Sequence, residues 1–221
     1  MILEVDNVAK GYTQASKKLD VLNGLDLKID KPKSIAILGK SGSGKSTFLS
    51  LLGGLDRPDE GKIVVNGQNI TAMKESELAK YRAENIGIVF QQFRLMKTFT
   101  ALENVMLPLE ILKKDNPREK AMKALEQVGL AERANHFPHQ LSGGECQRVA
   151  VARAIAPEPK IILADEPSGN LDTETGDYVM NMIFDLCKRR ESVLILVTHD
   201  TDLARSCDQV YELSSKQLKL V

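Results

Sequence analysis

The sequence predicts an α/β protein with a parallel sheet and a helical insert. Toward both ends of the 221-residue chain, short apolar runs with strand character alternate with helical segments, a pattern typical of a parallel sheet covered by helices. Through the middle of the chain the apolar residues recur mostly at helical spacing instead. We therefore expect one domain over residues 1–221, with its core at 1–92 and 159–221 and a helical subdomain at about 93–158.

The composition predicts a soluble protein with a sizeable core. Hydrophobic residues make up 43% of the chain and charged residues 27%, and the formal net charge is +0, so no overall attraction to nucleic acid or anionic lipid is expected. Three scattered cysteines suit a reducing cytosol. No apolar run approaches the roughly eighteen residues that cross a bilayer, and the N-terminus does not resemble a signal peptide. A role at a membrane would therefore require a partner.

Two strands are expected in the first thirty or so residues. Residues 2–6 alternate between apolar and polar side chains, as a half-exposed strand does, and 21–29 form a second strand. Between them the chain is expected to turn away after Tyr12 into a polar stretch over 13–20. Tyr12 could stack on a flat base. Its position alone also allows an aromatic side chain that only fills a surface gap.

A glycine-rich stretch, GKSGSGKST, follows the apolar strand 34–38 and precedes the helix-like segment 48–52. This strand–loop–helix context is the one that the pattern GxxxxGK[ST] requires. Glycines let backbone N–H groups surround phosphate oxygens, and the helix adds its positive dipole end. Lys45 can reach the terminal phosphates, and the Ser46 hydroxyl can hold Mg²⁺. The sequence therefore predicts a nucleoside triphosphate site at Gly39, Lys40, Ser41, Gly42, Ser43, Gly44, Lys45, Ser46 and Thr47.

A hairpin, a helix and a strand are expected next. Asn66-Gly67 between apolar runs is a strong hairpin signal, residues 75–84 have helical spacing, and 86–90 form a strand. Gln91 ends that strand with an amide that could contact a metal ion or water. By itself, Gln91 is equally consistent with a surface glutamine.

Helices continue through the middle of the chain. A break is expected at 115–118, followed by a helix over 121–128 that Gly129 ends. The next helix begins after Ser142, whose hydroxyl would form a capping box with Glu145.

This second helix start is itself rich in glycine. Ser142, Gly143 and Gly144 form an anion-binding helix N-terminus of the same kind as the phosphate loop. One nucleotide seldom needs two such helix starts from one chain. We therefore expect this one to serve a nucleotide held by another copy, which implies a dimer with two shared sites.

Two acidic residues follow the strand expected at 160–164. Asp165 would order the ligands of Mg²⁺, and Glu166 could accept a proton from an attacking water. An isolated acidic pair would more simply start a turn, but the phosphate loop upstream favours the catalytic interpretation. After the apolar strand 193–197, His199 could contact a γ-phosphate or be a satisfied strand-end residue.

The segment LSGGE at 141–145 resembles the signature motif of the ATP-binding cassette (ABC) ATPases. The other motifs of that family match in order: Walker A at 39–47, the Q-loop at Gln91, Walker B at 161–166, the D-loop at 168–172, the switch histidine at His199 and the adenine-stacking aromatic at Tyr12. The resemblance implies a P-loop NTPase core, with a mostly parallel sheet plus an N-terminal antiparallel β-subdomain, and an inserted helical subdomain. It also implies hydrolysis of ATP with Mg²⁺.

The resemblance assigns a role to each site residue. Three residues are expected to act in catalysis: Glu166, His199 and Lys45. Three are expected to hold Mg²⁺: Ser46, Gln91 and Asp165. The nucleotide would contact the Walker A residues, Tyr12, Gln91 and, from a second copy of the chain, Ser142, Gly143 and Gly144. Glu166 would activate water, while Lys45, His199 and the second copy's helix start would stabilise charge on the γ-phosphoryl group.

Finer features resemble one subfamily, the lipoprotein-release, macrolide-export and cell-division cassettes (LolD-, MacB- and FtsE-like). These features are FQQF at 90–93, TALENV at 100–105 followed by Leu107-Pro108, and PSGNLD at 167–172. Members pair with FtsX-like membrane subunits and transmit ATP-driven motion to them. The resemblance therefore implies an ATP-sandwich homodimer, cytoplasmic and peripheral on the inner face of the membrane through an FtsX- or MacB-type permease, with no nucleic acid partner.

Two other functions stay open at this point. A division-type regulator would gate a periplasmic hydrolase through its membrane partner and move no substrate. A soluble cassette acting on DNA or ribosomes is disfavoured, because the chain has no coiled-coil insertion, no second cassette and no excess of basic residues. The sequence does not name a cargo, since substrate contacts would belong to the partner.

The segment just past Gln91 has two interpretations. Its apolar side chains could form a socket for a helix of the membrane subunit, or they could belong to the core; they are Phe93, Leu95, Met96 and Phe99. Departures from the family pattern are few, and none falls on a catalytic group. They are Cys146 in the signature helix, Lys31-Pro32-Lys33 before Walker A, Ser168 after Walker B and Ser214-Ser215-Lys216 in the last hairpin.

Overall fold

The computed structural model describes residues 1–14 and 17–221, and its backbone divides into two compact units. The first unit contains Met1–Ala79 and Val193–Val221, and the second contains Lys80–Ser192. These units follow backbone compactness, whereas the expected domain boundaries follow the motifs, and those boundaries stay a prediction. Within the described part of the chain, no helix is both long and apolar enough to cross a membrane.

An antiparallel sheet of four strands forms much of the first unit. Its order is β2-β1-β4-β5, with β1 at Leu3–Gln14, β2 at Lys17–Ile29, β4 at Glu60–Val65 and β5 at Gln68–Asn69. Leu3 and Val5 are buried, in keeping with the predicted alternation. Asn66 and Gly67 have φ of 49° and 77°, the left-handed conformation that a two-residue hairpin turn requires. The predicted hairpin and the antiparallel β-subdomain are both present.

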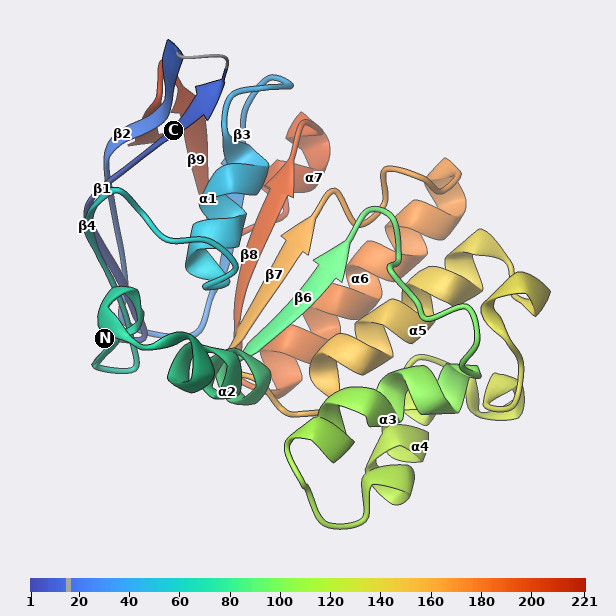
Figure 1. Ribbon diagram of the computed structural model, residues 1–221. Coiled ribbons are helices and arrows are strands. Elements are labelled where there is room, and N and C mark those ends of the chain that lie inside the picture. The colour runs from blue at the N-terminus through green and yellow to red at the C-terminus, as the bar shows by residue number, and fades with distance from the viewer. Residues whose placement is uncertain (15–16) are drawn as a thin grey trace. The chain divides into compact units, whose positions relative to one another are not determined.

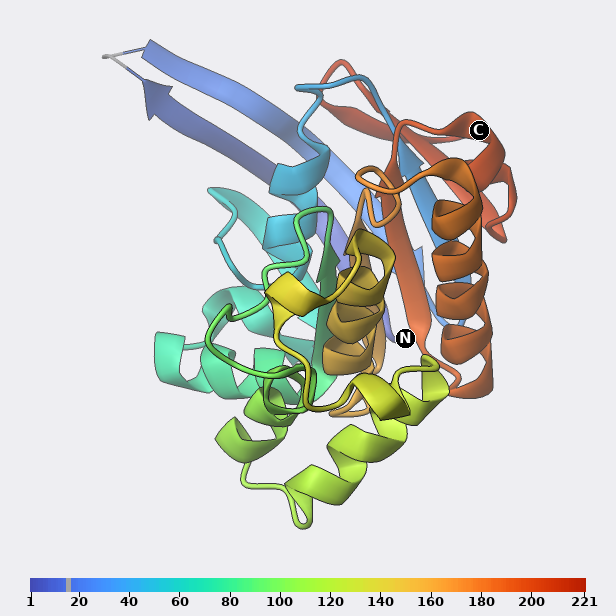
Figure 2. The same ribbon diagram turned by 90° about the vertical axis from the view of Figure 1, so that its right-hand side faces the viewer.

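The expectation that the chain leaves the sheet after Tyr12 was wrong. β1 continues to Gln14 and pairs with β2 from Lys17 onward, so that Tyr12 lies opposite Leu19. Figure 2 shows these two strands as two long blue ribbons that lie side by side. A β-ladder is held by backbone hydrogen bonds, which do not require apolar side chains. The remaining two residues of the polar stretch, 15 and 16, lie outside the described residues.

Parallel strands, one antiparallel strand and two helices form most of the rest of the first unit. β3 (Ser34–Leu38) pairs in parallel with β8 (Val193–Thr198) and β9 (Gln209–Ser214), and β10 (Gln217–Leu220) pairs antiparallel with β9. All six residues of β8 are buried, as is typical of a parallel strand that is covered on both faces. Helix α1 (Lys45–Leu52) follows β3, and α7 (Thr201–Arg205) follows β8 (Figure 1).

In the second unit, β6 (Ile86–Phe90) and β7 (Ile161–Asp165) pair in parallel. Its helices are α3 (Ala101–Ile111), α4 (Pro117–Gln127), α5 (Gly143–Ile155) and α6 (Thr173–Arg189), with 3-10 turns at Ala131–Arg133 and Pro138–Gln140. Helix α2 (Glu75–Asn85) runs in sequence from the first unit into the second, after a 3-10 turn at Ile70–Ala72. Residues 93–158, all of them described, contain helices and turns but no strand, as predicted.

Of the helix boundaries in the second unit, the end of α4 follows the predicted signal, whereas its start lies four residues before the expected 121, inside the break expected at 115–118. Pro117 is the first residue of α4, where a missing N–H costs nothing. The helix ends at Gln127, and Gly129 two residues later has φ 70°, the left-handed conformation that terminates many helices. Helix α5 also packs closely on β6. The close contact is at Gly87, where an added Cβ would collide with the carbonyl oxygen of Ala154 in α5, so that only glycine fits there.

Candidate functional site

The phosphate loop, residues 39–44, connects the buried strand β3 to helix α1. Gly42 and Gly44 have φ of 78° and 100°, a region that side-chain-bearing residues rarely adopt. A Cβ on Gly39 would lie 2.5 Å from Ser43 Oγ and 2.8 Å from the Leu213 carbonyl oxygen, whereas one on Gly42 would meet nothing within 4 Å. Gly39 therefore allows a tight turn, and Gly42 leaves open space where a ligand can approach the backbone.

Lys45, the first residue of α1, is folded back into this loop. Its ammonium Nζ donates to the carbonyl oxygens of Gly39 at 2.7 Å and Lys40 at 3.1 Å, and the residue is only 8% exposed. The Ser43 hydroxyl is buried and has no hydrogen-bond partner among the residues that the structure describes. A buried ammonium and a buried unpartnered hydroxyl, beside the N-terminus of a helix, fit a polyphosphate.

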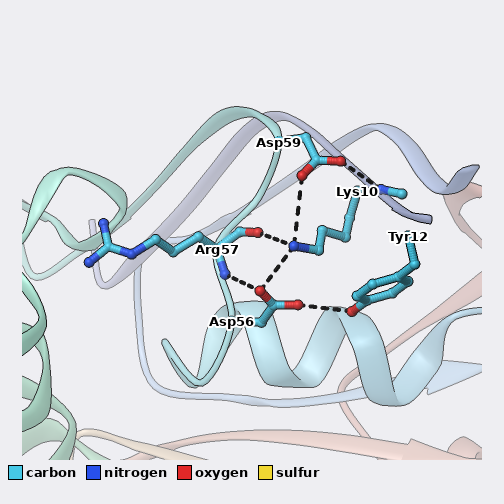
Figure 3. A network of polar contacts seen from close by, with 6 residues as sticks. Lys10, Tyr12, Asp56, Arg57 and Asp59 are labelled. Carbon is cyan, nitrogen blue, oxygen red and sulfur yellow. Dashed lines mark hydrogen bonds and ion pairs between the residues drawn. The ribbon is translucent and has the colours of Figure 1, made fainter. Parts of the chain in front are cut away.

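Tyr12, the predicted adenine-stacking residue, is held in place by a polar network (Figure 3). Its hydroxyl donates to Asp56 Oδ2 at 2.9 Å, and the residue is 41% exposed. Lys10 Nζ lies 5.1 Å from the centre of the tyrosine ring and donates to Asp56 Oδ1 at 2.9 Å and to the Arg57 carbonyl oxygen at 2.7 Å. The backbone N–H of Gly11 donates to Asp59. The exposed ring is thus anchored at its polar end.

The charges in this network reinforce one another. Burial would raise the pKa of Asp56, but hydrogen bonds from Lys10, the Arg57 backbone and Tyr12 hold that pKa below its usual value. Burial would likewise lower the pKa of Lys10, but the neighbouring carboxylates of Asp56 and Asp59 raise it. Both groups therefore stay charged at neutral pH. Nothing in the sequence pairs Lys10 with residues more than forty positions away, so sequence reasoning missed this cluster.

His199 follows β8 at the edge of the sheet where the phosphate loop begins. Leu38 of β3 lies beside Thr198 of β8 in the parallel register, so Gly39 and His199 are the next residues on two neighbouring strands. His199 is exposed, and Asp200 after it caps α7 by accepting from the N–H groups of Asp202 and Leu203. The first unit thus brings the phosphate loop and His199 to one edge, where open α/β sheets bind ligands.

The second unit places three predicted residues at one sheet edge in the same way. Phe90 of β6 pairs with Asp165 of β7, so Gln91 and Glu166 both follow paired strand ends. Glu166 has φ 46°, a conformation that residues with a side chain adopt infrequently and that is found at turns and at active sites. The N–H of Gly169 donates to the Glu166 carbonyl oxygen at 3.0 Å and closes this turn.

Gln91 is paired with Asn170 of the D-loop. Gln91 Nε2 donates to Asn170 Oδ1 at 3.3 Å, and Asn170 Nδ2 donates to the Gln91 carbonyl oxygen at 2.9 Å. The sequence predicted the D-loop segment, but it gave no reason to pair Asn170 with Gln91. The amide of Gln91 therefore already has a protein partner, and this partner connects the Q-loop to the D-loop.

The capping box predicted at the signature helix is confirmed. Ser142 Oγ accepts from the N–H of Glu145 at 3.2 Å, and Glu145 Oε2 accepts from the N–H of Ser142 at 2.8 Å. This backbone hydrogen bond, together with the charge of Arg133, lowers the pKa of Glu145. Ser142 and Gly143 are exposed, whereas Gly144 is buried against Thr175 of α6. The absence of a side chain at Gly144 thus allows α5 to pack closely on α6, while the N-terminus of α5 remains exposed at Ser142 and Gly143.

Two side chains that the sequence analysis did not single out, one buried and one half-buried, hold the segment after the Q-loop. Asn104 of α3 is 0% exposed; its Oδ1 accepts from the Met96 N–H at 2.8 Å, and its Nδ2 donates to the carbonyl oxygens of Met96, Phe99 and Thr100. Arg153 of α5 donates to the Arg94 and Phe93 carbonyl oxygens at 2.6 and 2.9 Å. The segment 93–100 is therefore fixed by its backbone, while Met96 remains 48% exposed.

A glycine-rich loop between a buried parallel strand and a helix, in an α/β fold, defines a P-loop nucleoside triphosphatase. The chain belongs to the ABC transporter family, whose model matches residues 22–169. It is an ATP-hydrolysing cassette subunit of that family.

Several relatives match the chain along its whole length. It is 46% identical to the lipoprotein-releasing system ATP-binding protein LolD of Treponema denticola, over 100% of this chain and 98% of the relative. It is 44% identical to the uncharacterized ABC transporter ATP-binding protein YbbA of Escherichia coli K12, over 99% of this chain and 96% of the relative.

Comparison with solved structures also matches the chain to ABC cassettes. The dimeric structure of MJ0796, a bacterial ABC transporter cassette, is 38% identical with a TM-score of 0.91, over 98% of this chain and 96% of that one. A second dimeric structure of MJ0796, in a post-hydrolysis state bound to ADP and Pi, matches equally well. The predicted family and fold are confirmed.

Proposed function

We propose that this chain forms an ATP-sandwich homodimer on the cytoplasmic face of the membrane and powers an FtsX- or MacB-type permease in lipoprotein release. The full-length similarity to proteins named for lipoprotein release carries the proposal. The exposed helix start at Ser142 and Gly143 supports the dimer, because it offers a second phosphate-binding surface beyond the chain's own phosphate loop.

The catalytic assignment follows from the site residues. Lys45 would bind the β- and γ-phosphates, Glu166 would take a proton from the attacking water, and His199 would hold the γ-phosphate. The oxygen donors of Ser46, Gln91 and Asp165 suit Mg²⁺, which would neutralise charge on the phosphate oxygens. Gln91 would use its oxygen Oε1 for this, while its nitrogen Nε2 contacts Asn170.

Glu166→Gln tests the catalytic and dimer proposals together. Without the base, phosphate release should fall by about 10²–10⁴-fold, while ATP binding is retained and the ATP-bound dimer accumulates. Light scattering after gel filtration with ATP measures the dimer, and Glu126→Gln on exposed α4 is the matched control. Turnover near the wild-type rate would contradict the role of Glu166, and a monomer in saturating ATP would contradict the sandwich.

The docking surface proposed for the permease is the segment 93–100. Met96→Asp should prevent co-purification of the permease from membranes and abolish partner-stimulated ATPase activity, because a charge would replace an exposed apolar side chain on a fixed backbone. Basal ATPase activity should not change. Ile111→Asp, at an exposed apolar position at the end of α3, is the control. Normal assembly of the Met96→Asp variant would exclude this surface.

The partner itself distinguishes lipoprotein release from the alternatives. Co-purification from membranes with mass spectrometry should recover a permease with few spans and a large outer domain. In vesicles, that complex should then release lipoproteins when ATP is added. A complex that instead activates a periplasmic hydrolase, or recovery of ribosomes or nucleic acid without a permease, would overturn this function.

A further inference from the structure

Gln147 is a fully buried amide inside the second unit, on helix α5 five residues after Ser142. It is 0% exposed. Its Nε2 donates to the Pro167 carbonyl oxygen at 2.7 Å and lies 3.4 Å from the Phe90 carbonyl oxygen. Its Oε1 is buried without a hydrogen-bond partner among the described residues. The amide orientation is nevertheless fixed, since the opposite orientation would place an oxygen against two carbonyl oxygens.

The two carbonyl groups flank residues with proposed roles in the reaction. Phe90 directly precedes Gln91, and Pro167 directly follows Glu166. One side chain of the signature helix thus holds the backbone beside the Q-loop and beside the catalytic carboxylate. A hydrogen bond in such a buried place is strong, and a carbonyl group left without its donor is costly.

Glu166 depends on its neighbours for its conformation. Its backbone has φ 46°, in the left-handed region that residues with a side chain adopt infrequently, so that contacts from the surrounding structure help to hold it. Hydrogen bonds that hold this turn include Gly169 N–H to the Glu166 carbonyl oxygen at 3.0 Å, and Gln147 to the Pro167 carbonyl oxygen. Of these two donors, only Gln147 comes from another element.

We propose that Gln147 is a positioning residue that fixes Glu166 for hydrolysis and ties it to the signature helix. The inference rests on the proposed role of Glu166 as the base. Gln147 acts through backbone and does not touch the nucleotide, so its loss lowers kcat and leaves the KM for ATP unchanged. A side chain that served only to fill the core would affect stability instead.

Gln147→Glu provides a pH-dependent test. A protonated carboxyl can donate to the Pro167 carbonyl oxygen as the amide does, but a carboxylate cannot, and burial should raise the pKa of the introduced group. The ratio of variant to wild-type kcat should therefore be near one at about pH 6 and fall about tenfold or more at about pH 8.5, since small displacements of a catalytic group can cost up to about a hundredfold. The KM for ATP should stay within about twofold at both pH values.

Gln147→Met has a similar volume and no donor, so its kcat should be low at every pH with KM unchanged. Gln217→Met, at an exposed position of β10, is the matched control and should behave as wild type. Thermal melting at each pH shows that the variants are folded at the assay temperature. A flat, near-wild-type kcat ratio for Gln147→Glu, or a rise in KM that accounts for the lost activity, would overturn the proposal. If both Gln147 variants failed to fold, the proposal would also be overturned, because Gln147 would then be needed for stability and not for positioning Glu166.

Glu166→Gln separates this inference from the function on which it rests. If that variant loses turnover while Gln147→Glu is insensitive to pH, Glu166 is the base and only the positioning role is wrong. If Glu166→Gln keeps its turnover, the proposed base is wrong, and the positioning role with it.

Discussion

The exposed ring of Tyr12 is preorganised, because contacts with its neighbours fix its position in the absence of a ligand. Its hydroxyl is tied to Asp56, and Asp56 is tied to Lys10, whose ammonium lies near the ring. A ring with a fixed position loses less conformational entropy on stacking than a mobile one. The contact between Tyr12 and Asp56 should therefore contribute to nucleotide affinity, although neither the hydroxyl nor the carboxylate is part of the stacking surface.

A double-mutant cycle measures this contribution. Tyr12→Phe and Asp56→Asn should each weaken ATP binding by about three- to tenfold, in line with the roughly 1 kcal/mol that one side-chain hydrogen bond contributes. The double variant should be weakened by less than the sum of the two single effects, because each single variant weakens the Tyr12–Asp56 contact, while only Asp56→Asn also weakens the ion pair with Lys10. Binding is measured with a fluorescent ATP analogue, and kcat at saturating ATP should not change. Tyr178→Phe, an exposed tyrosine on α6, is the control; fully additive effects would show that the contact does not matter.

The start of helix α1 illustrates, at the scale of an element, why the phosphate loop needs glycine for two different reasons. Gly44 has φ 100°, and a Cβ there would lie 2.9 Å from side-chain atoms of both Leu22 and Val21. Gly42 has φ 78°, but a Cβ there would meet nothing within 4 Å. A side chain at Gly42 would therefore meet backbone strain alone, whereas a side chain at Gly44 would meet both backbone strain and a steric collision.

Gly44→Ala should accordingly destabilise the protein more than Gly42→Ala. The left-handed backbone costs about 1–2 kcal/mol at either position, and the collision at Gly44 adds about 1–3 kcal/mol for overpacking. Urea unfolding of the chain without nucleotide measures both effects. Equal destabilisation of the two variants would mean that Leu22 and Val21 move aside freely.

Elements with strong local signals could be predicted from the sequence, and elements defined by pairing could not. The apolar strands, Gly129 and the capping box at Ser142 each have a local physical cause. The extension of β1 to Gln14 does not, because a polar segment becomes a strand only when a partner strand supplies its backbone hydrogen bonds.

The same distinction applies to the site. Motif residues could be located because a phosphate loop, a signature helix start and a strand-end carboxylate each have a fixed local pattern. Their supporting partners could not, since Asn170 lies 79 positions from Gln91 and Asp56 lies 44 from Tyr12. These supporting contacts are tertiary, and only the folded chain shows them.

At the scale of the whole molecule, nucleotide should act as a folding ligand. A ligand that binds only the native state adds about 2.7 kcal/mol of stability at a hundredfold excess over its Kd. ATP with Mg²⁺ should therefore raise the thermal midpoint by several degrees, and EDTA should reduce the shift. Lys45→Ala should show almost no shift, because the loop loses its ammonium. A shift of wild-type size in Lys45→Ala would contradict the placement of the nucleotide.

The buried amide of Asn104 has a kinetic consequence. It holds the backbone of Met96, Phe99 and Thr100 in place within the chain itself. If the segment 93–100 is the docking surface proposed above, association with the permease includes no folding step of this segment, and encounter rather than rearrangement sets its rate. A cassette that has left its permease would then rebind as fast as the two proteins meet, with no delay for the segment to fold.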